Sequence, residues 1–132
     1  MDTHEVFNDS YARCQRNKQF FLIFYHHFWQ KEQRFKEIFK GVDMERQVQM
    51  LKLSISMIML ASSSDQAKES VRRFGKAHGP GGIGVRPSDF DVWLDSLIET
   101  VQICDPRYND EIAIAWRQCF KEGIAIMKKE CL

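Results

Sequence analysis

Proline and glycine are scarce in this sequence, with three prolines and seven glycines among 132 residues. Both residues interrupt regular secondary structure, so their scarcity favours long uninterrupted helices. No segment shows the alternation of apolar and polar residues that is typical of a half-buried strand, and repeats and low-complexity tracts are missing too. The sequence therefore predicts an all-α fold in one domain, residues 1–132, long enough to bury a hydrophobic core.

The sequence also lacks a marked excess of either charge, because 19 basic residues are balanced by 18 acidic ones. Domains that bind nucleic acid usually carry a basic footprint, so we expect no nucleic-acid partner. The longest apolar runs, residues 20–25 and 55–61, are far too short to cross a membrane. The first residues do not have the basic-then-apolar order of a signal peptide. We therefore expect a cytoplasmic protein that makes no contact with a membrane.

The cysteines show no spacing that would indicate a metal site, and no Cys-x-x-Cys-His motif for covalent haem attachment is present. Free thiols in a reducing compartment are the expected state of all four. They are Cys14, Cys104, Cys119 and Cys131.

What the sequence does contain is a series of apolar stripes at helical spacing. They predict seven helical segments. These cover residues 3–16, 18–30, 32–39, 43–61, 65–78, 87–104 and 109–129.

Several residues mark the expected ends of these helices. Asp43 is a candidate N-cap, and Ser88 with Asp91 has the spacing of a capping box. The run Gly79-Pro80-Gly81-Gly82 should end the fifth helix, with glycine in the left-handed conformation that follows many helix C-termini. The pair Asp105-Pro106 should end the sixth.

Four side chains are unusual for their positions. His78 lies on the apolar stripe of the fifth helix, Tyr25 lies among phenylalanines, Gln47 flanks an apolar face, and Phe39 precedes a Lys-Gly corner. Each has an ordinary structural interpretation: a helix-terminal histidine, a core aromatic or a solvated amide. Together they supply an imidazole, a hydroxyl, an amide and a flat ring, which a haem pocket would use.

The chain resembles the bacterial globins, particularly single-domain haemoglobins and the globin half of flavohaemoglobins, over nearly its whole length. Tyr25 and Phe39 are fourteen residues apart, the interval between the distal tyrosine and the haem-stacking phenylalanine in that family. The resemblance implies a globin fold whose helices pack around a non-covalently held b-type haem. The matching segments are Phe24-Tyr25-x-x-Phe28, Ile38-Phe39 with Gln47-x-x-x-Leu51, Lys76-Ala77-His78 followed by Val85-x-Pro87-x-x-Phe90, and Ala115-Trp116.

The resemblance also implies a role for each matching residue. His78 would be the proximal iron ligand, and Tyr25 and Gln47 would face the bound gas. A buried hydroxyl donor stabilises the partial negative charge of bound oxygen. A hydrogen bond to a charged acceptor contributes about 1.5–3 kcal/mol. The haem-contacting residues would be Phe39, Leu51, Phe74, Val85 and Phe90.

Two features depart from the flavohaemoglobin pattern. Phe90 stands where that family has a tyrosine, and the chain ends near the position of the glutamate that pairs with it. The proximal imidazole would therefore lack the carboxylate partner that makes it a stronger electron donor, which argues against peroxidase-like chemistry. The loop after His78 is also longer and rich in glycine.

Two further histidines follow Tyr25 on the same helix. His26 and His27 should point roughly 100° and 200° away from Tyr25. We expect them at the surface or at a helix contact, with the alternative that one of them is a sixth iron ligand when no gas is bound.

The expected function is reversible binding of oxygen, nitric oxide or carbon monoxide. One alternative is a nitric oxide dioxygenase that works with a separate reductase, because 132 residues leave no room for a flavin or nicotinamide domain. Another is a haem-free globin-fold module for signalling or protein interaction. Tyr25, Gln47 and His78 argue against that module, since a haem-free core has little use for them.

Overall fold

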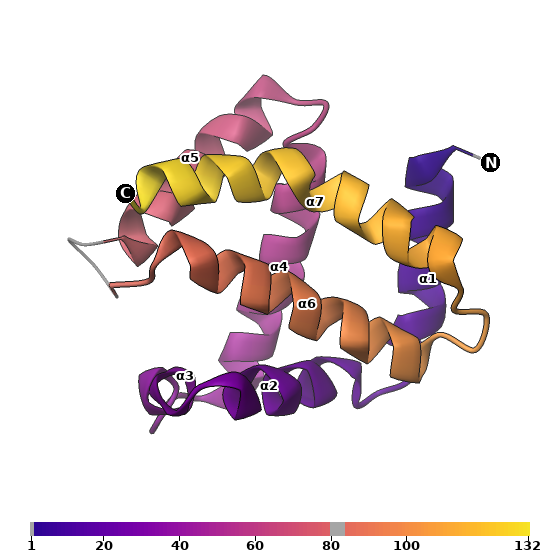
Figure 1. Ribbon diagram of the computed structural model, residues 1–132, viewed down its shortest axis with the longest axis horizontal. Coiled ribbons are helices and arrows are strands. Elements are labelled where there is room, and N and C mark those ends of the chain that lie inside the picture. The colour runs from indigo at the N-terminus through magenta and orange to yellow at the C-terminus, as the bar shows by residue number, and fades with distance from the viewer. Residues whose placement is uncertain (1, 80–83) are drawn as a thin grey trace. The chain divides into compact units, whose positions relative to one another are not determined.

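The computed structural model describes residues 2–79 and 84–132, and helices are the only regular secondary structure within them. The all-α prediction is confirmed, and all seven expected helices are present. Over the described residues, no helix combines the length and apolarity needed to span a lipid bilayer. The helices are α1 (Thr3–Gln15), α2 (Phe20–Lys31), α3 (Gln33–Ile38), α4 (Met44–Leu60), α5 (Asp65–His78), α6 (Pro87–Cys104) and α7 (Asp110–Glu130) (Figure 1).

The chain forms two compact units, and each is built from two separate stretches of sequence. The first unit comprises Met1–Val42 and Val92–Cys119, and the second comprises Asp43–Asp91 and Phe120–Leu132. Helices α6 and α7 each supply residues to both units. The two units are described one at a time below.

The core of the first unit is largely aromatic. The ring of Trp116 in α7 lies edge-on to Phe7 in α1, with 4.7 Å between the ring centroids. Further along, Phe28 in α2 stacks on Phe35 in α3 at 4.4 Å. Rings of this kind bury large apolar areas and add a further contribution from their geometry, so they fix α1, α2 and α3 within this unit.

A buried polar network crosses the same core. The Asp105 carboxylate follows the end of α6 and accepts hydrogen bonds from the Arg13 guanidinium at 2.7 and 3.0 Å and from the Ser10 hydroxyl at 2.6 Å. Ser10 in turn accepts from the indole N–H of Trp116 at 2.9 Å. The backbone N–H of Arg107 also donates to Asp105. Every donor in this chain of bonds has an acceptor, as a buried polar group requires.

The second unit is held together by close approaches between helix backbones. A Cβ atom added to Gly123 in α7 would lie 2.5 Å from the side chain of Ile58 in α4. A Cβ atom added to Gly75 in α5 would lie 2.7 Å from Cβ of Glu130 in α7. The C-terminal end of α5 therefore lies against the C-terminal end of α7, and the two helices cross there in Figure 1. Glycine at these two positions lets helices pack more closely than any side chain would allow.

Two of the predicted helix ends are confirmed. The Asp43 side chain accepts hydrogen bonds from the N–H groups of Glu45 and Arg46, as expected of an N-cap. Helix α6 ends at Cys104, directly before Asp105. The Ser-rich break after α4 also provides a cap, because the Ser64 hydroxyl accepts from the N–H of Ala67.

The predicted end of α5 is confirmed at His78, but Gly79, the residue that follows, is not in the left-handed conformation. Its φ of −79° and ψ of −162° are extended, not left-handed. Glycine is needed there for a different reason, because a Cβ atom would lie 3.0 Å from the carbonyl oxygen of Glu130. Residues 80–82 of the predicted turn lie outside the described residues.

The predicted capping box of α6 was also wrong. Pro87 is the first helical residue, and the Asp89 carboxylate accepts from the backbone N–H of Arg86 at 2.9 Å. Ser88 therefore lies inside the first turn instead of before it, which suits proline's preference for the first helical position. Asp91 instead forms an ion pair with Lys128 of α7, at 2.7 Å.

Candidate functional site

Two of the predicted site residues lie together in the first unit. The ring of Tyr25 is 3% exposed and lies 5.3 Å from the ring of Phe39, measured between centroids. Tyr25 comes from the middle of α2, and Phe39 directly follows α3. The short connection between these helices turns the chain back, so that residues fourteen positions apart become neighbours. The ring of Phe39 remains half-buried.

A third aromatic residue, Trp29, completes this cluster and was not predicted from the sequence. Its ring lies 5.7 Å from Tyr25 and 6.0 Å from Phe39, between centroids. The signal was present, because Trp29 is one helical turn after Tyr25 and so shares its face. The indole Nε1 atom is buried, and no group among the described residues accepts a hydrogen bond from it. A buried N–H without an acceptor is rare in proteins.

The predicted residues of α4 lie in the second unit. Leu51 is 3% exposed, and Gln47, one turn earlier, is half-buried. The spacing of four residues places both on one face of the helix. Ile55 and Ile58 continue this face and are buried too. Gln47 therefore places an amide one turn before this apolar stripe.

His78 is the last residue of α5, and one of its ring nitrogens has a clear partner. The Nδ1 atom lies 2.6 Å from the carbonyl oxygen of Phe74, one turn earlier. A carbonyl can only accept, so Nδ1 carries the proton and donates it. In a neutral imidazole the lone pair then lies on Nε2. No protein group among the described residues is hydrogen-bonded to Nε2, and the His78 side chain is half-buried.

The other predicted residues of the second unit lie on α5, on α6 and in the loop between them. The rings of Phe74 and His78 are 6.4 Å apart. The N–H of Val85 donates to the carbonyl of His78 at 2.7 Å, so the loop after α5 returns to the end of that helix. Phe90 is buried in the first turns of α6. Phe74 and Val85, in contrast, remain half-buried.

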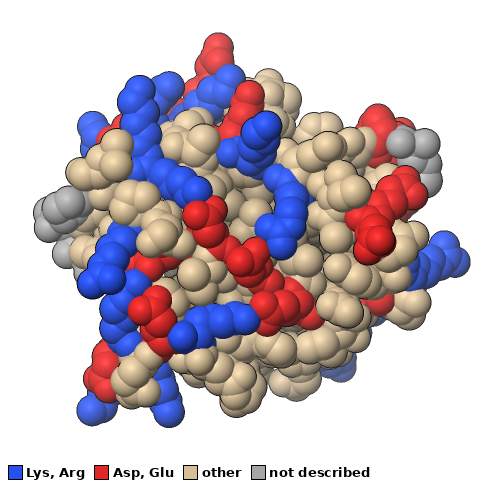
Figure 2. Space-filling model, viewed as in Figure 1, with Lys and Arg blue, Asp and Glu red and all other residues tan. Residues whose placement is uncertain are grey.

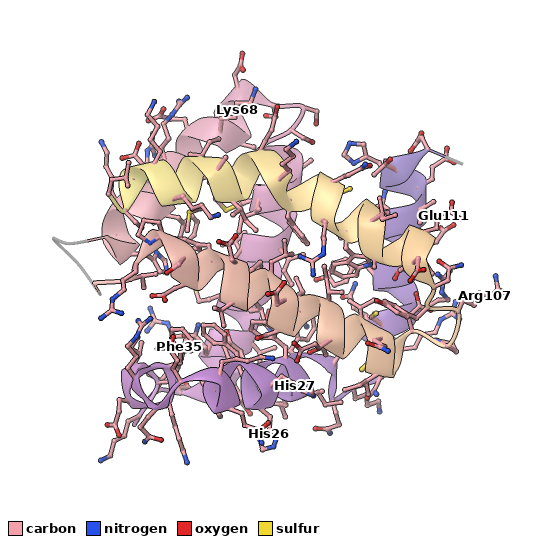
Figure 3. The ribbon with its side chains drawn as sticks, in the orientation of Figure 1. His26, His27, Phe35, Lys68, Arg107 and Glu111 are labelled. Atoms are coloured by element: carbon pink, nitrogen blue, oxygen red, sulfur yellow. The ribbon has the colours of Figure 1, made fainter. Side chains whose placement is uncertain are left out.

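His26 and His27 lie on α2 (Figure 3), and each contacts another side chain. His26 is exposed and lies 3.1 Å from the side-chain amide of Gln30. Nδ1 of His27 lies 3.2 Å from Glu99 of α6, and Glu99 also accepts from Lys31 at 2.6 Å. Burial would raise the pKa of Glu99, but the hydrogen bonds from Lys31 and His27 outweigh it and hold that pKa below its ordinary value. The sequence prediction of surface or helix-contact roles agrees with these positions.

The surface carries both signs of charge in close proximity. Lys and Arg side chains lie next to Asp and Glu side chains on the face drawn in Figure 2. Arg117 pairs with Asp95 at 3.0 Å within the first unit, as Lys128 does with Asp91 in the second. Such exposed pairs contribute little to stability but keep the surface hydrated.

The chemistry of these residues fits a haem. Haem iron takes a neutral imidazole nitrogen, and the hydrogen bond from Nδ1 of His78 to a backbone carbonyl is the type that orients metal-bound histidines. Porphyrin needs apolar contacts, and the half-buried Phe39, Phe74 and Val85 present apolar surface that the protein itself leaves partly uncovered. Tyr25 and Gln47 supply polar hydrogen-bonding groups.

Comparison with known proteins gives one informative match. No family model matches the chain, and no curated protein matches it either. A crystal structure of a protein from Pseudomonas aeruginosa, described as structurally highly homologous to a human hemoglobin, matches with a TM-score of 0.91 and 29% sequence identity. The match covers 98% of both chains. The match confirms the predicted globin fold, in addition to the all-α class.

Proposed function

We propose that this chain, a bacterial globin, binds one b-type haem non-covalently through His78 and reversibly binds a diatomic gas on its iron. The observation that carries the proposal is the hydrogen bond from Nδ1 of His78 to the carbonyl of Phe74, at 2.6 Å. It fixes the tautomer in which Nε2 holds the lone pair, as an iron ligand must.

The remaining residues act on the haem and on the gas in distinct ways. Phe39 would stack on the porphyrin, and Leu51, Phe74, Val85 and Phe90 would make the remaining contacts with the haem. Bound haem supplies an iron that takes oxygen, nitric oxide or carbon monoxide. Apolar side chains around it exclude water and so slow oxidation of the iron.

Tyr25 and Gln47 would stabilise the bound gas by hydrogen bonding. Oxygen is the most polar of these ligands when bound, so a hydroxyl donor favours it over carbon monoxide. A hydrogen bond to a charged acceptor contributes about 1.5–3 kcal/mol, which corresponds to roughly ten- to a hundredfold slower release.

The location and the redox partner form part of the same proposal. The four cysteines are buried free thiols, which fits a reducing compartment, and we place the protein in the cytoplasm. A separate reductase would keep the iron ferrous.

Haem binding is tested by adding haem to the purified chain and recording ferric, ferrous and carbon monoxide spectra. The proposal predicts stoichiometric binding and a five-coordinate ferrous form that takes up carbon monoxide. A chain that folds but gives no Soret band would support the haem-free interaction module instead.

The distal role is tested by Tyr25→Phe, which removes only the hydroxyl. Oxygen should leave the variant roughly ten- to a hundredfold faster, whereas release of carbon monoxide should change much less. Tyr11→Phe is the matched control, because Tyr11 packs against Trp116 instead, with ring centroids 5.8 Å apart. Equal changes for the two gases would indicate a steric effect, and no change would place Tyr25 outside the pocket.

A further inference from the structure

The indole Nε1 of Trp29 is a buried polar atom of the first unit without a hydrogen-bond partner among the described residues. The residue as a whole is half-buried, but the Nε1 atom itself is closed off from water. Its N–H therefore lacks the hydrogen bond that the polar end of a tryptophan usually makes.

The contrast with Trp116 shows that this fold can satisfy an indole. The N–H of Trp116 donates to the Ser10 hydroxyl at 2.9 Å. Removing water from an N–H without replacing its hydrogen bond destabilises the fold. An orphaned donor of this kind therefore indicates an acceptor from outside the chain, or a group with another function.

The neighbours of Trp29 indicate where that acceptor comes from. Its ring packs on Tyr25 at 5.7 Å and on Phe39 at 6.0 Å. These are the two residues of the first unit to which the proposed function assigns contacts with gas and porphyrin. Tyr25 is itself 3% exposed, so this side of the Trp29 ring faces the interior of the first unit.

We propose that the Trp29 indole N–H is a further hydrogen-bond donor of the haem pocket, and that its acceptor is an oxygen atom that arrives with the cofactor. Two sources share this chemistry, a porphyrin carboxylate and the outer atom of the bound gas. The inference rests on the proposed function and extends it, because it adds a donor that the resemblance to globins does not supply.

The proposal makes an unusual prediction about Trp29→Phe. Without haem, the substitution removes an orphaned donor, so the free energy of unfolding of the apoprotein should stay the same or rise. With haem, the substitution removes a hydrogen bond, so haem loss or oxygen release should accelerate roughly ten- to a hundredfold, the factor for a hydrogen bond to a charged acceptor. A residue with only a packing role would destabilise both forms in the same direction.

Trp116→Phe is the matched control. It also replaces a tryptophan by phenylalanine, but Trp116 is fully buried and the substitution breaks a hydrogen bond made within the chain. It should lower the free energy of unfolding of the apoprotein and of the haem complex alike. Ultraviolet resonance Raman spectra of the wild type provide a second readout, because the indole N–H band that disappears in Trp29→Phe should shift when haem binds.

Two measurements distinguish the sources of the acceptor. Reconstitution with haem dimethyl ester removes the carboxylates, so wild type and Trp29→Phe should then lose the ester at equal rates if a carboxylate is the acceptor. If the gas is the acceptor, Trp29→Phe should instead accelerate release of oxygen much more than release of carbon monoxide.

The inference fails if haem loss and oxygen release of Trp29→Phe equal those of the wild type, or if the apoprotein is destabilised as strongly as the haem complex. Either result would leave haem binding through His78 intact. A wild-type chain that takes up no haem would overturn the proposed function first, and this inference with it.

Discussion

Asp105 is the residue whose removal should affect the fold most clearly. Its side chain is fully buried, at 0% exposure, and the Arg13 side chain paired with it is 16% exposed. The carboxylate receives charge-assisted bonds from Arg13 and further hydrogen bonds from the Ser10 hydroxyl and the Arg107 N–H. Asp105→Asn keeps the size of the side chain and one acceptor oxygen but removes the charge.

The expected loss follows from these contacts. Breaking a buried ion pair by removing one partner costs about 3–5 kcal/mol. The asparagine oxygen retains part of the bonding and Arg13 can regain some water, so we expect a decrease of about 2–4 kcal/mol in the free energy of unfolding. Urea unfolding at neutral pH, followed by circular dichroism, measures it. Asp95→Asn is the control, because that carboxylate is 52% exposed and should change stability by less than about 1 kcal/mol.

The difference in the free energy of unfolding between the wild type and Asp105→Asn should also depend on pH in a defined direction. Burial would raise the pKa of Asp105, but the Arg13 guanidinium and the hydrogen bonds from Ser10 and Arg107 outweigh it, so the pKa lies below its ordinary value. A lowered pKa in the folded state stabilises the protein above the unfolded-state value of about 3.9, and this contribution is lost as pH falls through the folded-state pKa. The gap between wild type and Asp105→Asn should therefore narrow in acid. A variant as stable as the wild type, or a gap that does not change with pH, would refute this reasoning.

Three further predictions concern the packing of α5 against α7, the reactivity of the thiols and the two histidines of α2. Gly75→Ala should lower the free energy of unfolding by roughly 1–3 kcal/mol, because its Cβ would lie 2.7 Å from Cβ of Glu130; unchanged urea unfolding would contradict this close contact. No thiol of the native protein should react rapidly with Ellman's reagent at neutral pH. All four thiols are buried, and burial raises the pKa of Cys14 to about 12. Rapid labelling of the folded protein would contradict this prediction. His26→Ala and His27→Ala should leave the ferrous haem spectrum five-coordinate and unchanged, and a loss of low-spin bands in either variant would identify a sixth ligand.

The helices could be predicted because their signals are local. Apolar residues at steps of three and four define the faces of α4 and α5, and Asp43 caps a helix through atoms only two and three residues away. The same reasoning placed Tyr25 and His78 on helices, and it placed Phe39 at the end of a short helical segment. Such signals depend only on neighbours in sequence, so a single chain reveals them.

The features that sequence reasoning missed depend on residues far apart in the chain. Asp105 was expected only to end a helix, because its partners Ser10 and Arg13 lie 95 and 92 residues away. Gly79 was expected only as part of the run that ends α5, because its close approach to the carbonyl oxygen of Glu130 joins α5 to the distant end of α7. The unsatisfied indole of Trp29 becomes evident only from the positions of the acceptors among the described residues.

The central claim is that His78 ligates the iron, and His78→Gly with imidazole tests it most directly. Removal of the side chain should abolish most of the Soret absorbance, and added imidazole should restore haem binding with a spectrum close to that of the wild type, because the free ligand enters the space left by the side chain. His27→Gly, prepared in parallel, should keep its haem, and added imidazole should not change its spectrum. If His78→Gly instead retains haem with the wild-type ferrous spectrum in the absence of imidazole, His78 is not the ligand.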